Sequence, residues 1–229
     1  MAKTVPVVED ILSTNQKIAF KNRSQFDEGG VFAINLMASP GAGKTSLITE
    51  TIKGMSGEYR IAYIDGDIAT SIDADKVAKL KVPAVQINTG GQCHLDAMMI
   101  QKALPQLELG ETDLLIVENV GNLVCPTSFH LGIHRNVLIA SIPEGDDKPY
   151  KYPGMYQGVD VIVLNKMDVL DSFDFRMDYF RQGVEILNPG LSFFPLSCKT
   201  GEGVREWNDW LRTEILKYQK DGGEGYELR

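Results

Sequence analysis

Cysteine is scarce in this chain of 229 residues, which contains only Cys93, Cys125 and Cys198. Such a small and odd number excludes a fold built on disulfide bonds. It indicates a reduced, cytoplasmic protein whose cysteines pack, react or bind metal. Basic residues are also few, because 23 lysines and arginines face 31 acidic residues and the net charge is −8. This balance argues against nucleic acid or an anionic membrane as a partner.

Long hydrophobic runs are missing as well. No apolar run reaches the roughly 20 residues that a membrane-spanning helix needs, and the first ten residues lack the apolar core of a signal peptide. The composition, 43% hydrophobic and 24% charged, is typical of a soluble globular protein. The length suits one α/β domain with a sizeable core.

Short apolar runs alternate with amphipathic segments along the chain. The pattern predicts strands over residues 31–37, 60–64, 82–87, 113–117, 137–142, 159–164 and 191–196, and helices over 44–53, 95–104, 173–187 and 204–218. The strands are continuous apolar runs, which is typical of a mainly parallel sheet with helices on both faces. We expect a helical leader packed on the domain over residues 1–30, one domain over 31–218 and a frayed tail over 219–229.

The run Ala38-Ser-Pro-Gly-Ala-Gly-Lys-Thr45 lies between a predicted strand and a predicted helix, which is the context of a phosphate-binding P-loop. Glycine lets the backbone curl so that N–H groups face phosphate oxygens, and the helix start adds its positive end. Lys44 would reach the β- and γ-phosphates, and the Thr45 hydroxyl would bind Mg²⁺. The nucleotide contacts expected here are Gly41, Ala42, Gly43, Lys44, Thr45 and Ser46. The alternative is a Gly-rich turn with a solvated lysine, and Ala38 stands where the motif normally opens with glycine.

Carboxylates follow two further predicted strands. Glu118 ends the run Leu114-Leu-Ile-Val-Glu118, which has the form of a Walker B segment, although Asp is usual there. It could hold Mg²⁺ or orient the attacking water, or it could simply cap the next loop. Asp65 and Asp67 follow another strand, and we favour Asp67 as the Mg²⁺ ligand. Lys44, Asp67 and Glu118 are therefore the expected catalytic group.

The segment Asn165-Lys-Met-Asp168 matches the Asn-Lys-x-Asp element of GTPases. A carboxylate at Asp168 can accept hydrogen bonds from guanine N1–H and the N2 amine, which adenine cannot supply. The Lys166 stem can lie against the base. Asn165, Lys166 and Asp168, with the later triplet Ser197-Cys198-Lys199, form the expected base site. A solvated turn is the alternative.

Cys93 and His94 are adjacent after one predicted strand, and Cys125 follows the next. If those strand ends are neighbours, one imidazole and two thiolates converge on a site for Ni²⁺ or Zn²⁺. The alternative is that both cysteines are small buried hydrophobic residues. Cys198 is expected to be a packed or base-side thiol rather than a metal ligand. His130 and His134 are expected to be ordinary surface histidines.

Taken together, these stretches resemble the HypB family of hydrogenase nickel-insertion GTPases over about residues 30–215. The matching runs are Ser39-Pro-Gly-Ala-Gly-Lys-Thr45, Gly66-Asp-Ile-Ala-Thr70, Thr89-Gly-Gly-Gln-Cys-His94, Val117-Glu-Asn-Val-Gly-Asn-Leu-Val-Cys125, Asn165-Lys-Met-Asp168 and Ser197-Cys-Lys-Thr-Gly-Glu-Gly203. The resemblance implies an α/β P-loop GTPase fold and a GTP-dependent homodimer with metal held at its interface by Cys93, His94 and Cys125. It also implies nickel delivery to a hydrogenase large subunit together with a small zinc-containing chaperone.

One departure from the family is visible, because residues 1–30 contain no Cys or His, whereas many members carry a nickel site there. Metal handling would then rest on the GTPase domain. Val169, Leu170 and Phe173 could form part of a dimer patch or pack on their own sheet. No arginine is clearly placed as a finger, so we expect slow intrinsic GTP hydrolysis. Open alternatives are a urease-accessory nickel GTPase, a P-loop kinase acting on a small molecule, and a GTP-binding module without metal.

Overall fold

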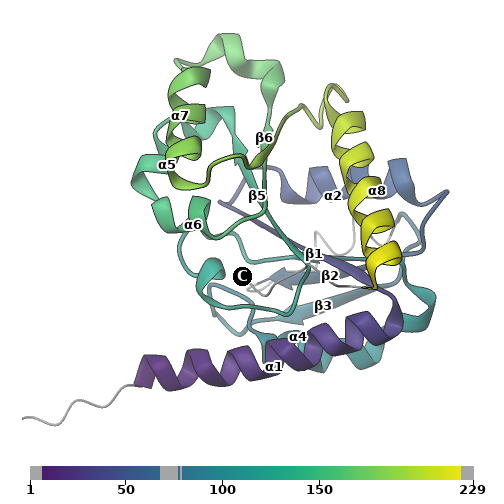
Figure 1. Ribbon diagram of the computed structural model, residues 1–229. Helices are drawn as coiled ribbons and strands as arrows, with labels where there is room; N and C mark the ends of the chain where they lie inside the picture. Colours follow the sequence, from purple (N-terminus) through teal and green to yellow (C-terminus); the bar gives the residue numbers. More distant parts are fainter. Residues whose placement is uncertain (1–6, 68–76, 78, 223–229) are drawn as a thin grey trace, which may run out of the picture.

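The computed structural model describes residues 7–67, 77 and 79–222. Its centre is a seven-stranded sheet in the order β3-β2-β4-β1-β5-β6-β7, in which every pairing is parallel (Figure 1). The strands are β1 Phe32–Ala38, β2 Ile61–Asp67, β3 Ala84–Asn88, β4 Leu114–Glu118, β5 Arg135–Ser141, β6 Val161–Asn165 and β7 Ser192–Pro195. The predicted parallel α/β architecture is confirmed.

Helices cover both faces of the sheet. They are α1 Val7–Gly29, α2 Lys44–Met55, α4 Ala97–Ala103, α5 Lys148–Lys151, α6 Pro153–Gln157, α7 Met177–Leu187 and α8 Val204–Asp221. On one face α2 and α8 bury residues such as Ile48 and Trp207 against β1, β4, β5 and β6. On the other face, α1 and α4 cover one end of the sheet, and α6 and α7 cover the other. Figure 1 shows α1 and α4 running side by side below the sheet, away from α2 and α8.

Several element boundaries differ from those expected. Helix α7 begins only at Met177, because the backbone is extended at Phe173 and Arg176, after a 3-10 helix over 167–172. Helix α8 continues to Asp221, past the expected end at Tyr218. The short helices α5 and α6 were missed, because each spans one turn and carries a proline within its first turn. Residues 1–6 of the expected leader and 223–229 of the expected tail lie outside the described residues.

Strand β3 is an edge strand with alternating exposure, so its apolar run is half-buried rather than buried on both faces. Strands β1 and β4 are central and fully buried. Their carboxyl ends, with that of β2, carry the P-loop, Glu118 and Asp67, which is where ligands gather in parallel sheets. Within the described ranges, no helix is both long and apolar enough to cross a bilayer.

Candidate functional site

The P-loop turns sharply into α2 at Gly43, whose φ is 106° and which precedes the first helical residue, Lys44. A Cβ atom on Gly43 would lie 2.3 Å from the Nδ2 atom of Asn165, so only glycine fits between the P-loop and that side chain. The start of α2 therefore faces the strand ends with its backbone N–H groups and the positive end of its dipole. This arrangement is the one that binds phosphate in P-loop proteins.

A cavity of about 490 Å³ lies between the P-loop, Asp67 at the end of β2 and residues 118–121 after β4. The Thr45 hydroxyl donates a hydrogen bond to one carboxylate oxygen of Glu118 at 3.0 Å, and the Tyr63 hydroxyl donates to the other at 2.6 Å. Lys44 also lines this cavity. Asp65 is buried away from it, which favours Asp67 over Asp65 as a cation ligand.

The Asn165-Lys-Met-Asp168 segment is fastened to the P-loop. The Asn165 amide donates to the carbonyl oxygen of Ala42 at 3.0 Å, and Lys166 Nζ donates to that of Gly41 at 2.6 Å. Lys166 has a φ of 65°, a conformation that few non-glycine residues adopt. The segment thus takes a defined position beside the phosphate-binding loop rather than forming a solvated turn.

Asp168 accepts a hydrogen bond from the Ser197 hydroxyl at 2.7 Å, and Lys199 Nζ lies 3.5 Å from its other oxygen. These contacts, with Ser197 the larger, hold the pKa of Asp168 below its usual range. The backbone N–H of Cys198 donates to the Asn165 side chain at 3.2 Å. The Cys198 thiol packs against the core below α2 and α8, and burial raises its pKa to about 12, so it is a packed thiol.

Cys93, His94 and Cys125 converge, with their ligand atoms all within 4.8 Å of one another. The two sulfur atoms are 3.1 Å apart, and Cys93 Sγ lies 3.7 Å from His94 Nδ1. Two ligands of one zinc ion can be at most about 4.6 Å apart, twice a zinc–sulfur bond, so the separations of 3.1 Å and 3.7 Å suit a single cation. Thiolate and imidazole are ligands that Zn²⁺ and Ni²⁺ accept.

The two strand ends are not neighbours, so the arrangement that the sequence left open is not the one found. Strand β2 lies between β3, which leads to Cys93, and β4, which leads to Cys125. The loops close the gap instead, through asparagines that follow β4. The Asn119 side chain accepts from the Leu95 N–H at 3.1 Å, and the Asn122 side chain donates to the Cys93 carbonyl oxygen at 3.3 Å.

The surroundings tune two of these ligands. The His94 ring stacks on Phe129, with 3.8 Å between ring centroids. Partial burial lowers the pKa of His94, which keeps the imidazole neutral and able to bind metal. The neighbouring thiol of Cys93 raises the pKa of Cys125, so a metal ion must displace a thiol proton to bind there.

The metal cluster and the phosphate cavity share one short segment. Residues 118–125 begin with Glu118 in the cavity and end with Cys125 in the cluster. Gly121 in this segment packs on the P-loop, since a Cβ there would lie 3.2 Å from the backbone nitrogen of Pro40. Gly66 in β2 lies closer still to Leu95, which follows His94, since a Cβ there would lie 2.6 Å from Leu95 Cδ1.

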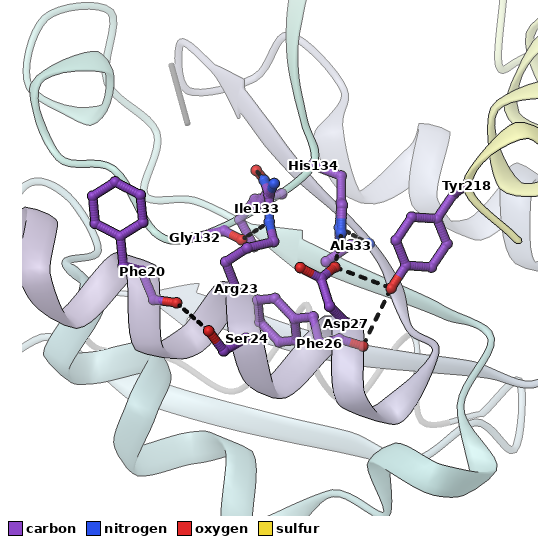
Figure 2. Close-up of polar contacts among 10 residues, drawn as sticks. All are labelled: Phe20, Arg23, Ser24, Phe26, Asp27, Ala33, Gly132, Ile133, His134 and Tyr218. Atoms are coloured by element: carbon purple, nitrogen blue, oxygen red, sulfur yellow. Dashed lines mark hydrogen bonds and ion pairs between the residues drawn. The ribbon is translucent and has the colours of Figure 1, made fainter. Parts of the chain in front are cut away.

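His134 is not a surface residue, which corrects the expectation. It is 2% exposed, and its ring stacks on Phe32 and meets Tyr218 edge-on. Figure 2 shows His134 directed toward Asp27 of α1, with Nε2 at 3.0 Å from the carboxylate. Its Nδ1 accepts the Ala33 N–H at 2.9 Å, and burial lowers its pKa to about 4, so it is neutral. His130 is half-buried.

Sequence reasoning missed several residues that shape the site. Glu144 accepts hydrogen bonds from the Ser39 hydroxyl of the P-loop and from the Ser141 hydroxyl at 2.7 Å. Glu144 lies just after β5 but 105 residues from Ser39, so no local signal linked it to the P-loop. Asn119 lay in the matched Glu-Asn-Val-Gly stretch, but only its contact with Leu95 reveals what it holds.

Two expectations remain partly open. Ile68-Ala-Thr70, in the stretch after Asp67, lies outside the described residues. Val169 and Leu170 pack against the core beside α7, whereas Phe173 is 45% exposed. The dimer patch therefore stays a prediction.

The model of the CobW/HypB/UreG nucleotide-binding domain matches residues 32–195. The chain is 43% identical to hydrogenase maturation factor HypB of Azotobacter vinelandii over 213 residues, which cover 93% of this chain and 70% of that one. Among solved structures it resembles HypB from Helicobacter pylori in complex with nickel, with a TM-score of 0.86, 33% identity, and coverage of 94% and 100%.

HypB from Archaeoglobus fulgidus is similar too, with a TM-score of 0.83, 36% identity, and coverage of 89% of this chain and 99% of that one. The P-loop, the Asn165-Lys-Met-Asp168 segment and the Cys-His-Cys cluster all lie within residues 32–195, which the family model matches. This chain belongs to the HypB branch of the CobW/HypB/UreG nucleotide-binding family.

Proposed function

We propose that this protein is a Mg²⁺-dependent GTPase that couples its nucleotide state to the delivery of nickel during hydrogenase maturation. The observation that carries the proposal is the segment 118–125, which has a cavity carboxylate at one end and a metal-ligating thiol at the other. The Helicobacter pylori relative, whose structure is a complex with nickel, supports nickel as the cargo.

The nucleotide side of the proposal uses groups around the cavity. Lys44 and the P-loop N–H groups neutralise phosphate charge, and Thr45 and Asp67 hold Mg²⁺. Glu118 orients water or Mg²⁺, while Asp168 selects guanine. No arginine is among the residues lining the cavity in the described part of the chain, which suits slow intrinsic hydrolysis.

The nucleotide cavity and the metal cluster would be coupled through hydrogen bonds between the segment after β4 and the loop that carries Cys93 and His94. A cation at Thr45 would compete with the hydrogen bond from Thr45 to Glu118, the residue that precedes Asn119. Asn119 holds the backbone of Leu95, and Asn122 holds that of Cys93. A change at the cavity would therefore shift the separation of the two metal-bearing loops, which amounts to a coupling free energy between two sites.

A metal ion at Cys93, His94 and Cys125 would have three protein ligands, one fewer than a closed tetrahedral site. We propose that a second copy of the chain completes it, which makes the active form a homodimer. Water is the alternative fourth ligand. The hydrogenase large subunit and a small zinc-containing nickel chaperone are the proposed partners. A cytoplasmic location is proposed on the three free thiols.

The test is competitive binding of Ni²⁺ and Zn²⁺ to the wild type and to Cys93→Ala, with GDP or a non-hydrolysable GTP analogue, while the mass in solution is recorded. Cys198→Ser is the matched control, because it removes a thiol outside the cluster. We expect metal binding per dimer that Cys93→Ala abolishes, that Cys198→Ser retains and that the nucleotide shifts.

Four outcomes would count against the proposal. If Cys93→Ala bound as much metal as the wild type, the Cys-His-Cys site would be excluded, and a GTP-binding module without that metal site would be favoured. If nickel affinity were the same with GDP and with the GTP analogue, the proposed coupling between nucleotide state and nickel binding would be excluded. Phosphate transferred to an acceptor, rather than released, would identify a kinase. Preferential assembly with urease subunits would identify the urease-accessory alternative.

A further inference from the structure

Two asparagines of α1 each hydrogen-bond to both segments that follow the proposed metal ligands. The side-chain oxygen of Asn15 accepts the Ala97 N–H at 2.8 Å, and its amide nitrogen donates to the His130 carbonyl at 2.8 Å. The amide nitrogen of Asn22 donates to the carbonyls of Ala97 at 2.8 Å and Leu131 at 3.1 Å. Both asparagines are buried, Asn22 completely.

The positions of these contacts matter. Ala97 opens α4, three residues after His94, and its N–H lies at a helix start where backbone donors lack intrahelical partners. His130 and Leu131 follow Cys125 in the loop that leads to β5. The Asn15 carboxamide therefore links the Cys93–His94 loop to the Cys125 loop, and the Asn22 carboxamide forms a second link between them.

The spacing along α1 makes this possible. Residues 15 and 22 are seven positions apart, about two helical turns, so their side chains leave the same face. Further along that helix the Arg23 guanidinium donates to the Gly132 carbonyl at 2.8 Å and also to that of Ile133. Asp27 then contacts His134, so α1 follows the loop from residue 130 to 134 (Figure 2).

We infer that α1 is a brace for the metal cluster, and that Asn15 and Asn22 are positioning residues that set the separation of Cys93 and His94 from Cys125. The inference rests on the proposed metal site. Asn122 also joins the two loops near Cys93, so without the α1 contacts each loop keeps its own fold but the distance between the loops is held less firmly. Partners that orient metal ligands from outside change metal affinity by roughly 10- to 100-fold when removed.

Two measurements on Asn15→Ala and Asn22→Ala test the inference. The first is Ni²⁺ affinity by competition with a chelator, together with the nickel–thiolate absorption band. The second needs no metal, and measures the equilibrium between the Cys93 and Cys125 thiols and their disulfide in glutathione buffers. There, one glutathione disulfide accepts the two electrons and two protons and leaves as two glutathione thiols.

Peptide mapping confines the second measurement to the Cys93–Cys125 pair, because Cys198 is a third thiol. The control is Ser24→Ala, on the same helix, whose hydroxyl donates only within α1, to Phe20 at 3.1 Å (Figure 2). We expect each asparagine variant to lower nickel affinity and the disulfide equilibrium constant about tenfold, and the control to change neither.

Equal losses in Ser24→Ala, or unchanged values in both asparagine variants, would overturn the brace. A loss of nickel affinity with an unchanged thiol equilibrium would also overturn it, because the loops would then have kept their separation. If the wild type binds no nickel, the proposed metal site fails, and the thiol equilibrium still decides on the brace. If Asn22→Ala does not fold, Asn15→Ala decides alone.

Discussion

The Thr45 hydroxyl donates a hydrogen bond to the Glu118 carboxylate, with 3.0 Å between the two oxygen atoms. This contact joins the first turn of α2 to the end of β4, across the cavity that the P-loop encloses. Glu118 is 4% exposed and also accepts from Tyr63. A buried carboxylate held by two hydroxyl groups is pre-positioned to act on a cation or a water molecule at the phosphates.

Glu118→Gln is expected to lower the rate of GTP hydrolysis about 100-fold at saturating Mg²⁺, because a neutral amide is a weaker partner for Mg²⁺ and for the attacking water than a carboxylate. Single-turnover phosphate release measures this. Tyr63→Phe is the comparison, since it removes the 2.6 Å hydrogen bond and leaves the carboxylate in place. If Tyr63→Phe lost as much activity as Glu118→Gln, the hydrogen bond rather than the charge at position 118 would be the important feature.

Asp168→Asn is expected to weaken GTP binding roughly 10- to 100-fold. Guanine needs two acceptor oxygens, and the asparagine amide replaces one of them with an N–H donor. Xanthine nucleotide, which has a carbonyl at position 2, should bind this variant better than it binds the wild type. Lys199→Ala is the control, because its contact with Asp168 is long at 3.5 Å and the side chain is exposed, so a change of a few-fold is expected. Unchanged GTP affinity in Asp168→Asn would remove Asp168 from the base site.

Gly43→Ala and Gly41→Ala separate steric exclusion from backbone strain. Both positions have positive φ, 106° and 80°, so alanine costs about 1–2 kcal/mol of strain at each. At Gly43 the new Cβ also strikes the Asn165 amide, whereas at Gly41 it meets no atom within 4 Å. We expect the larger loss of GDP affinity and of unfolding free energy in Gly43→Ala. Equal losses would show that Asn165 gives way.

Protonation of His134 should make stability depend on pH. Its pKa in the folded protein is about 4, below the ordinary value of 6.5, chiefly because of burial. The unfolded chain therefore binds the proton first, and stability is full above pH 6.5 and falls as pH drops toward 4. The total loss is about 3 kcal/mol.

Urea unfolding between pH 7 and pH 4.5 measures this slope. In His134→Gln the slope should be smaller by the contribution of one proton. An unchanged slope in His134→Gln would place the titrating group elsewhere.

The local sequence was enough to predict most helices and strands and to identify each motif on its own. Strands such as 32–38 and 114–118 are buried on both faces, so they appear as continuous apolar runs. The P-loop and the Asn165-Lys-Met-Asp168 segment carry their chemistry within a few residues, and each follows a strand. Short helices such as 148–151 carry no periodic signal, and the exposure of β3 follows from its place at the sheet edge.

What the sequence alone determined is a parallel α/β protein with a phosphate-binding loop, an Asn-Lys-x-Asp segment and one Cys-His pair. The tertiary structure decided how these parts meet, because strand order and side-chain contacts between distant segments are not written in local periodicity. Strand β2 separates the strands that lead to Cys93 and Cys125, yet Asn122 and the asparagines of α1 bring the two loops together. His134 gives no sequence sign of burial, because the residues that cover it, Phe32 and Tyr218, come from opposite parts of the chain.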